Sequence, residues 1–128
     1  MSDKYVTVVG SKYYYGLEPF ALGRLLVCVK EHDNAIDTEA ISVKLPFINK
    51  IGYLGNAPYT VASGTYSAGR LYDHVGEAFY IRVCFIIANA IICRLEQGDK
   101  TVLRAEYEQQ AVEAVQSQPV NASLEQWD

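Results

Sequence analysis

The sequence predicts a small, mainly β protein, built as a partly open six-stranded β-barrel with short connecting helices and a C-terminal helix. Six short runs are rich in β-branched and aromatic residues, and clusters of Gly, Pro and Asn separate them. No segment between them has the regular alternation of strand and helix that parallel βαβ units show. A chain of 128 residues, half of them hydrophobic, suits one domain with one core.

The expected strands are, in chain order, residues 5–9, 25–30, 40–45, 50–54, 79–86 and 90–95. The third alternates clearly, because Ile41, Val43 and Leu45 are apolar whereas Ser42 and Lys44 between them are polar. Asn49 is expected to turn the chain into the fourth strand, and residues 88–89 to turn the last hairpin. We expect one helical turn at 19–23, and a loop followed by a short helix within 59–73.

From Asp99 onwards the residues favour a helix. Leu103, Tyr107, Ala111, Ala114 and Val115 recur at intervals of three or four, and Asp99 or Thr101 can cap the start. This apolar stripe can pack on the barrel, which we favour, serve a protein partner, or mediate homo-oligomer formation. The expected organisation is therefore a barrel at 1–96, a helix at 97–116 and a disordered tail at 117–128 that contains Trp127.

The net charge of −4 comes from the C-terminal part of the chain. Residues 1–96 contain nine Lys and Arg and nine Asp and Glu, whereas 97–128 contain two bases and six acids. A neutral barrel cannot attract nucleic acid by its overall field, so any binding needs a local basic patch.

Other features indicate a cytoplasmic protein without a membrane segment. No apolar run approaches the ~20 residues of a membrane span, and the first four residues do not resemble the start of a signal peptide. The three cysteines, Cys28, Cys84 and Cys93, lie in apolar runs, and their odd number argues against disulfides or a zinc site. We expect buried, reduced thiols.

Two stretches stand out as candidates for function. Residues 31–39 contain four acids, one Asn and one His, and Asx side chains there should bond their own backbone to form a tight turn. Taken alone, this is a solvated acidic loop. Tyr13, Tyr14 and Tyr15 follow Lys12, and in an extended segment neighbouring rings alternate sides, so at least one should be exposed as a base-stacking platform. The alternative is ordinary packing at the barrel rim.

Three motifs in this order resemble the HIRAN family, which occurs fused to helicases and nucleases and as small free-standing bacterial proteins. Residues 10–16 fit G-x-(K/R)-Y-Y-x-G, residues 30–43 fit K-E-x-x-N-x-x-D-x-x-A-I-x-V, and residues 51–54 read I-G-Y-L. The resemblance implies an OB-like barrel that grips the 3′ end of single-stranded DNA. In this resemblance Lys12 contacts phosphate, Tyr13 is the first stacking ring, and Asp37 accepts the terminal 3′-hydroxyl.

With Arg70 added from its glycine-rich and hydroxyl-rich loop, the candidate nucleic-acid-binding residues are Lys12, Tyr13, Tyr14, Asp33, Asn34, Ile36, Asp37, Lys50, Tyr53 and Arg70. Two positions depart from the family pattern. Ile36 stands where relatives often have an aromatic, and His32-Asp33 where they often have Pro-Asn. Stacking contributes ~1–3 kcal/mol per base, so losing one ring face lowers affinity roughly ten-fold or more.

Other classes fit less well. Residues 64–70 read G-x-x-x-x-G-R, but a phosphate-binding P-loop needs Lys where Arg70 stands and Ser or Thr where Leu71 stands. Arg70 can still touch a phosphate or lie against a tyrosine. No arrangement of nucleophile and base is visible, so we expect no enzyme and no cofactor. The main alternative is a protein-interaction or oligomerisation domain that uses the C-terminal helix. A weaker one is a metal-dependent accessory of a nuclease or helicase system, with Glu31, His32, Asp33 and Asp37 as ligands.

Overall fold

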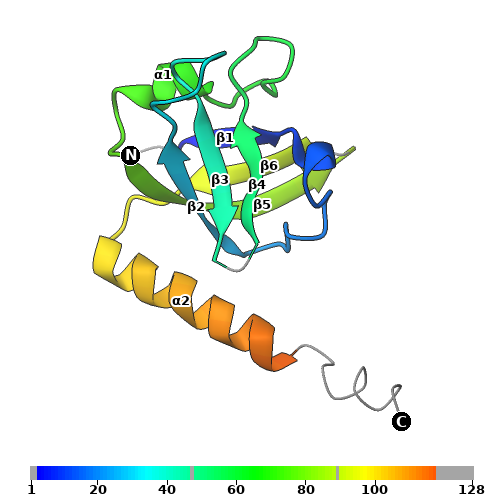
Figure 1. Ribbon diagram of the computed structural model, residues 1–128, viewed down its shortest axis with the longest axis vertical. Coiled ribbons are helices and arrows are strands. Elements are labelled where there is room, and N and C mark those ends of the chain that lie inside the picture. The colour runs from blue at the N-terminus through cyan, green and yellow to red at the C-terminus, as the bar shows by residue number, and fades with distance from the viewer. Residues whose placement is uncertain (1–2, 47, 89, 118–128) are drawn as a thin grey trace.

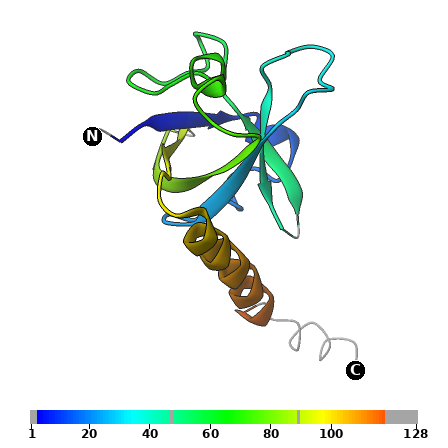
Figure 2. The same ribbon diagram turned by 90° about the vertical axis from the view of Figure 1, so that its left-hand side faces the viewer.

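The computed structural model describes residues 3–46, 48–88 and 90–117, and within them the chain forms a six-stranded antiparallel barrel followed by a long helix (Figures 1 and 2). The strands are β1 (Tyr5–Val9), β2 (Leu25–Lys30), β3 (Ile41–Leu45), β4 (Asn49–Leu54), β5 (Ala78–Ile87) and β6 (Ala90–Leu95). The helices are the 3-10 turn η1 (Ser11–Tyr13), α1 (Ala68–Tyr72) and α2 (Lys100–Ser117). The predicted fold class is confirmed. The first and last residues of each predicted strand lie within one residue of those observed.

The barrel is closed, not partly open as we expected. The strand order is β1-β4-β3-β2-β5-β6, and β1 completes the circle by pairing with both β4 and β6. The register is irregular between Val43 and Lys44 and between Val83 and Phe85, and such bulges bend a sheet towards closure.

Gly52 of β4 allows this strand to approach β1 closely where the two pair, a place here called the seam of the barrel. A Cβ on Gly52 would lie 2.9 Å from both Val8 Cγ1 and the Val9 carbonyl oxygen. The glycine of the I-G-Y-L motif therefore has a packing role in this barrel.

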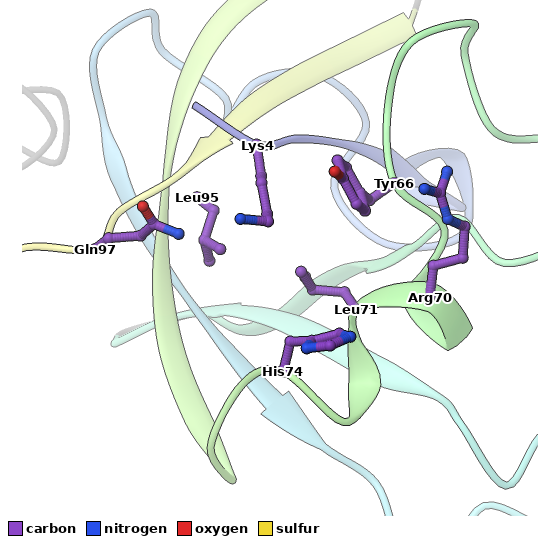
Figure 3. A pocket seen from close by; sticks show the side chains of 7 residues that line it. All are labelled: Lys4, Tyr66, Arg70, Leu71, His74, Leu95 and Gln97. Carbon is purple, nitrogen blue, oxygen red and sulfur yellow. The ribbon is translucent and has the colours of Figure 1, made fainter. Parts of the chain in front are cut away.

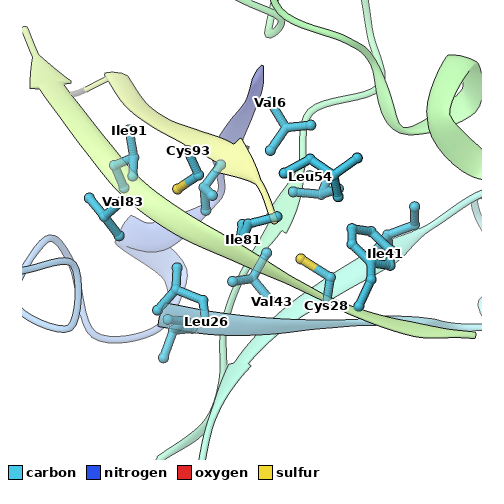
Figure 4. Packing of buried hydrophobic residues seen from close by; sticks show 14 of the residues in the cluster. Val6, Leu26, Cys28, Ile41, Val43, Leu54, Ile81, Val83, Ile91 and Cys93 are labelled. Atoms are coloured by element: carbon cyan, nitrogen blue, oxygen red, sulfur yellow. The ribbon is translucent and has the colours of Figure 1, made fainter. Parts of the chain in front are cut away.

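Alternate residues of the six strands fill the interior (Figure 4). Cys28 and Cys93 lie in this core, and burial raises the pKa of both thiols. Cys84 is only half-buried, so the expectation of buried thiols holds for two of the three cysteines.

The tyrosine segment is a turn, not an extended strand as we assumed. Gly10 and Gly16 have φ angles of 75° and 66°, a left-handed conformation that glycine adopts without strain. Between them, the N–H of Tyr13 donates to the Gly10 carbonyl (3.0 Å) and the N–H of Tyr14 to the Ser11 carbonyl (3.0 Å). Residues 19–23 form turns without the expected helix, and Gly23 has a φ of 83°.

Helix α2 docks on the outer face of the barrel. Asp99 caps it, because Asp99 Oδ1 accepts from the N–H groups of Thr101 (2.8 Å) and Val102 (3.2 Å). Leu103 is buried, and the Tyr107 ring lies 5.5 Å from the Tyr80 ring of β5. The side chains of Ala114 and Val115, and the tail at 118–128 with Trp127, lie outside the described residues.

Two polar contacts hold α2 in place. Gln110 pairs with the backbone of Leu25 in both directions: its Nε2 donates to the carbonyl (2.9 Å) and its Oε1 accepts from the N–H (2.6 Å). Arg82 of β5 binds Glu106 of the helix through two bonds (2.5 and 2.9 Å) and Glu96 of the barrel (3.0 Å). The Arg82 guanidinium thereby lowers the pKa of Glu106. Among the residues described, neither α-helix combines the length and apolar character needed to cross a bilayer.

Candidate nucleic-acid interface

The turn η1 and the two residues after it present three tyrosines to solvent beside a lysine. The exposed fractions are 75% for Tyr13, 39% for Tyr14 and 55% for Tyr15, so all three rings are accessible. Lys12 Nζ lies 5.1 Å from the centroid of the Tyr13 ring. Although the segment is a turn, the prediction of exposed tyrosines is confirmed.

The aromatic surface continues onto the outer face of β4. The Tyr14 ring lies 6.4 Å from the Tyr53 ring, and Lys50 Nζ lies 4.7 Å from the Tyr53 centroid. Residues Lys12, Tyr13, Tyr14, Tyr53 and Lys50, here called the aromatic–lysine strip, therefore form one surface from two elements.

Glu31, at the end of β2, neutralises one lysine of this strip. Its Oε2 lies 2.5 Å from Lys50 Nζ, and its Oε1 accepts from the Tyr53 hydroxyl (2.9 Å). Burial disfavours the charge on both Glu31 and Lys50, but their mutual contact outweighs it, lowering the pKa of Glu31 and raising that of Lys50. Lys50 is thus held by a carboxylate and is not free for a phosphate.

The acidic loop is a structured Asx turn, as the sequence predicted. Asn34 Oδ1 accepts from the N–H groups of Ile36 (3.0 Å) and Asp37 (2.9 Å), and Asp37 Oδ1 accepts from the N–H of Glu39 (2.9 Å). Asn34 Nδ2 also donates to Glu31 Oε1 (3.1 Å), which joins the loop to the strip.

Asn56 fixes the other side of Asp37. Its Nδ2 donates to Asp37 Oδ2 (3.1 Å), and its Oδ1 accepts from the N–H of Gly69 in α1 (2.8 Å). Each carboxylate oxygen of Asp37 has two acceptor sites, so each can accept one more hydrogen bond. The carboxylate of Asp37 is therefore positioned by three segments and retains acceptor capacity.

A groove of about 470 Å³ runs alongside the strip. Its lining residues are Val29, Lys30, Glu31, Asp33, Asn34, Lys44, Asn49 and Lys50. Lys30 Nζ donates to the Val75 carbonyl (2.9 Å) and Lys50 is held by Glu31. Lys44 has no ion pair with any carboxylate among the described residues, so its charge is available in the groove.

The structure brings most of the predicted residues to the strip, the groove and the adjoining loop, whereas the Arg70 side chain lines a different cavity. Asp33 and Asn34 line the groove, and Ile36 is 98% exposed at the tip of the loop. The Arg70 guanidinium lies 4.5 Å from the Tyr66 ring, which is one of the two placements we considered, and Arg70 lines a different cavity.

Three of the four candidate metal ligands bind other partners. His32 contacts Glu77, Glu31 contacts Lys50, and Asp37 contacts Asn56. Within the described residues, no three His, Cys, Asp or Glu side chains are grouped so as to hold a metal ion.

Sequence reasoning missed Glu31, Lys44 and Asn56 as parts of this site. Glu31 and Lys44 carried a weak signal, because one lies within the second motif and the other is polar on an alternating strand. Asn56 carried none, since an Asn before Ala-Pro indicates only a turn.

Comparison with known proteins identifies a similar fold. No protein-family model matches the chain, and no curated protein matches it. The structure is similar to a crystal structure of a protein from Lactobacillus plantarum from the Northeast Structural Genomics Consortium, with 26% sequence identity and a TM-score of 0.51. The match covers 72% of this chain and 88% of that chain.

Proposed function

We propose that this protein is a cytoplasmic binding module for single-stranded nucleic acid, and that it recognises the 3′ end of DNA. The observation that carries the proposal is the aromatic–lysine strip, in which the two exposed tyrosines beside Lys12, Tyr13 and Tyr14, continue into the Tyr53–Lys50 pair. The motif resemblance to the HIRAN family supports the same proposal, because its three motifs supply the strip and the adjoining loop.

Stacking is the main source of affinity in this proposal. Base–aromatic stacking contributes ~1–3 kcal/mol per base and tolerates any sequence, because every base has a π-face. Electrostatics contributes less, because the barrel region is neutral and Lys50 is held by Glu31. Lys12 and Lys44 are the cations of this surface that can contact phosphates.

Asp37 is the group proposed to select a 3′ end. A carboxylate accepts a hydrogen bond from a free hydroxyl but repels a phosphate, so it favours a terminal 3′-hydroxyl over a phosphorylated end. Its loop is joined to the strip through Asn34 and Glu31, and the exposed Ile36 offers an apolar surface beside it.

Fluorescence anisotropy with 5′-labelled oligothymidylate, ending in a 3′-hydroxyl or a 3′-phosphate, tests the proposal. We expect saturable binding at low salt that favours the 3′-hydroxyl, and Tyr13→Ala should weaken it roughly ten-fold. Tyr59→Ala is the matched control, because Tyr59 is a 91% exposed tyrosine outside the strip. Absence of saturable binding, or equal losses for the two variants, would refute the proposal.

The alternative function is an interaction or oligomerisation domain that uses the C-terminal helix. Part of the apolar stripe of α2 is already packed on the barrel and is not available to a partner. On the apolar stripe that a partner would need, Leu103 is buried and Tyr107 packs against Tyr80 of the barrel. Gln110 of the same helix bonds the backbone of Leu25. Analytical ultracentrifugation tests the oligomerisation form of this alternative, because the proposed binding module needs no self-association.

A further inference from the structure

A second cavity, of about 590 Å³, lies between the start of β1, the end of β6 and helix α1 (Figure 3). Leu71 of α1 and Leu95 of β6 are buried and form its apolar floor. The remaining lining residues are polar or aromatic: Lys4, Tyr66, Arg70, His74 and Gln97. None of them belongs to the aromatic–lysine strip or to its groove, so this cavity is a separate feature of the molecule.

The lining of this cavity contains three basic side chains and no acidic one. Lys4, Arg70 and His74 come from three separate segments, before β1, within α1 and after α1, and all three line the cavity. In the view of Figure 3 the Tyr66 ring stands between Lys4 and Arg70. None of the three forms an ion pair with a carboxylate among the described residues. Asp3 and Asp73 precede two of them in sequence but do not line the cavity.

Three other cations of the barrel are paired with carboxylates. Elsewhere on the barrel, Lys50, Arg82 and Arg94 each contact a glutamate at 3.0 Å or less. Cations that face one concave surface without counter-charges focus a positive potential there, and such a potential attracts anions.

Tyr66 gives the cavity a fixed aromatic wall. Its N–H donates to the Tyr5 carbonyl (2.7 Å), which holds its backbone against β1, and its ring lies 4.5 Å from the Arg70 guanidinium. Stacking on a ring restricts the guanidinium, so less conformational freedom is lost when it binds a ligand.

We propose that this cavity binds a phosphate monoester that carries a planar ring, as a nucleotide or a phosphorylated strand end does. The phosphate supplies several acceptor oxygens for the Lys4 ammonium and the Arg70 guanidinium, which can bind two of them at once. The ring of the ligand lies along Tyr66 and the leucine floor. This site goes beyond the proposed function and uses none of the residues of the aromatic–lysine strip.

Titrations of ¹⁵N-labelled protein with thymidine 5′-monophosphate, inorganic phosphate and thymidine, followed by NMR, test the site. With the nucleotide we expect saturable shifts of the backbone amides of Tyr66, Arg70 and His74. Inorganic phosphate should shift the same amides with a weaker dissociation constant, and thymidine without phosphate should leave them unchanged.

Arg70→Gln and Lys4→Gln should each weaken nucleotide binding about ten-fold, as loss of a charge-assisted contact does. Arg104→Gln and Lys100→Gln on α2 are the matched controls, because they remove the same charges outside the lining and should leave binding unchanged. Shifts that do not saturate, or equal losses in the controls and the cavity variants, would overturn the proposal.

A second titration distinguishes the two sources of the phosphate. If a 5′-phosphorylated oligothymidylate shifts these amides with at least ten-fold higher affinity than the mononucleotide, the cavity binds a strand end. Equal affinities identify it as a nucleotide site. Tyr13→Ala should leave mononucleotide binding unchanged, so failure of this site and failure of the proposed strip would be seen separately.

Discussion

Replacing Glu31 by Gln should strengthen single-strand binding and steepen its dependence on salt. In the native protein Glu31 holds Lys50 at 2.5 Å, which leaves Lys12 and Lys44 as the free lysines of the interface. The glutamine removes the negative charge but keeps a carbonyl oxygen that can accept from the Tyr53 hydroxyl. Lys50 then becomes available for a third phosphate.

The size of the effect follows from counterion release. Each phosphate contact on a single strand contributes ~0.7 to the log–log salt slope, so two contacts give roughly −1.4 and three give roughly −2.1. Between 50 and 200 mM salt, affinity should fall roughly seven-fold for the native protein and roughly 20-fold for the variant on these slopes.

Anisotropy titrations of a 5′-labelled oligothymidylate at several salt concentrations measure both slopes, and thermal unfolding confirms that each variant is folded. Glu39→Gln is the control, because it removes the same charge from the same loop without contacting Lys50. Both variants should gain some affinity from the reduced negative field. If their slopes are equal, Glu31 does not regulate Lys50 and the assignment of phosphate contacts is wrong.

Three further predictions concern the loop, the helix and the seam of the barrel. Asp37→Ala should weaken anisotropy-measured binding of 3′-hydroxyl strands more than of 3′-phosphorylated ones, and equal losses would exclude it as the selecting group. Gln110→Ala leaves the N–H and the carbonyl of Leu25 without the hydrogen bonds that Gln110 makes to them. It should lower the free energy of unfolding in urea by about 1–3 kcal/mol. Gln109→Ala on the exposed side of the same helix turn should change it by less than about 0.5 kcal/mol, and equal effects would contradict the docking argument. Gly52→Ala should lower the free energy of unfolding, measured by calorimetry, by about 1–3 kcal/mol, because the added Cβ would clash with β1. Gly98→Ala is its control and should not lower that free energy, because no atom lies within 4 Å of the added Cβ.

The strands were predictable because their signals are local. Runs of β-branched residues between turn-forming residues indicate where a strand begins and ends, and this holds for β2, whose bounds match residues 25–30. Closure was not predictable, because it depends on β1 pairing with two strands that lie far apart in sequence. The conformation of the tyrosine segment was also missed, since we took it as extended although the two glycines that frame it can adopt left-handed conformations.

In the candidate site, too, some features follow from the local sequence and others depend on the tertiary structure. The Asx turn at Asn34 and Asp37 follows from the chemistry of these side chains with their own backbone, so the sequence predicts it. The contact of Glu31 with Lys50 depends on the tertiary structure, which brings the end of β2 beside β4. Local patterns thus identify the candidate groups, and the tertiary structure decides which of them act together.

The pairing of charges explains how a neutral barrel can still offer sites for anions. Glutamates neutralise Lys50, Arg82 and Arg94, so these cations contribute little to an outward field. The cations without a carboxylate partner among the described residues include Lys12 and Lys44 near the strip, and Lys4 and Arg70 at the second cavity. Each of these places also presents tyrosine rings, Tyr13 and Tyr14 in the strip and Tyr66 in the cavity. Because the long-range field is weak and only Lys12 and Lys44 are free near the strip, the strip must depend on its rings for most of its affinity. Binding at the strip should therefore be only modestly sensitive to salt and strongly sensitive to loss of a ring, whereas binding at the second cavity should require the phosphate.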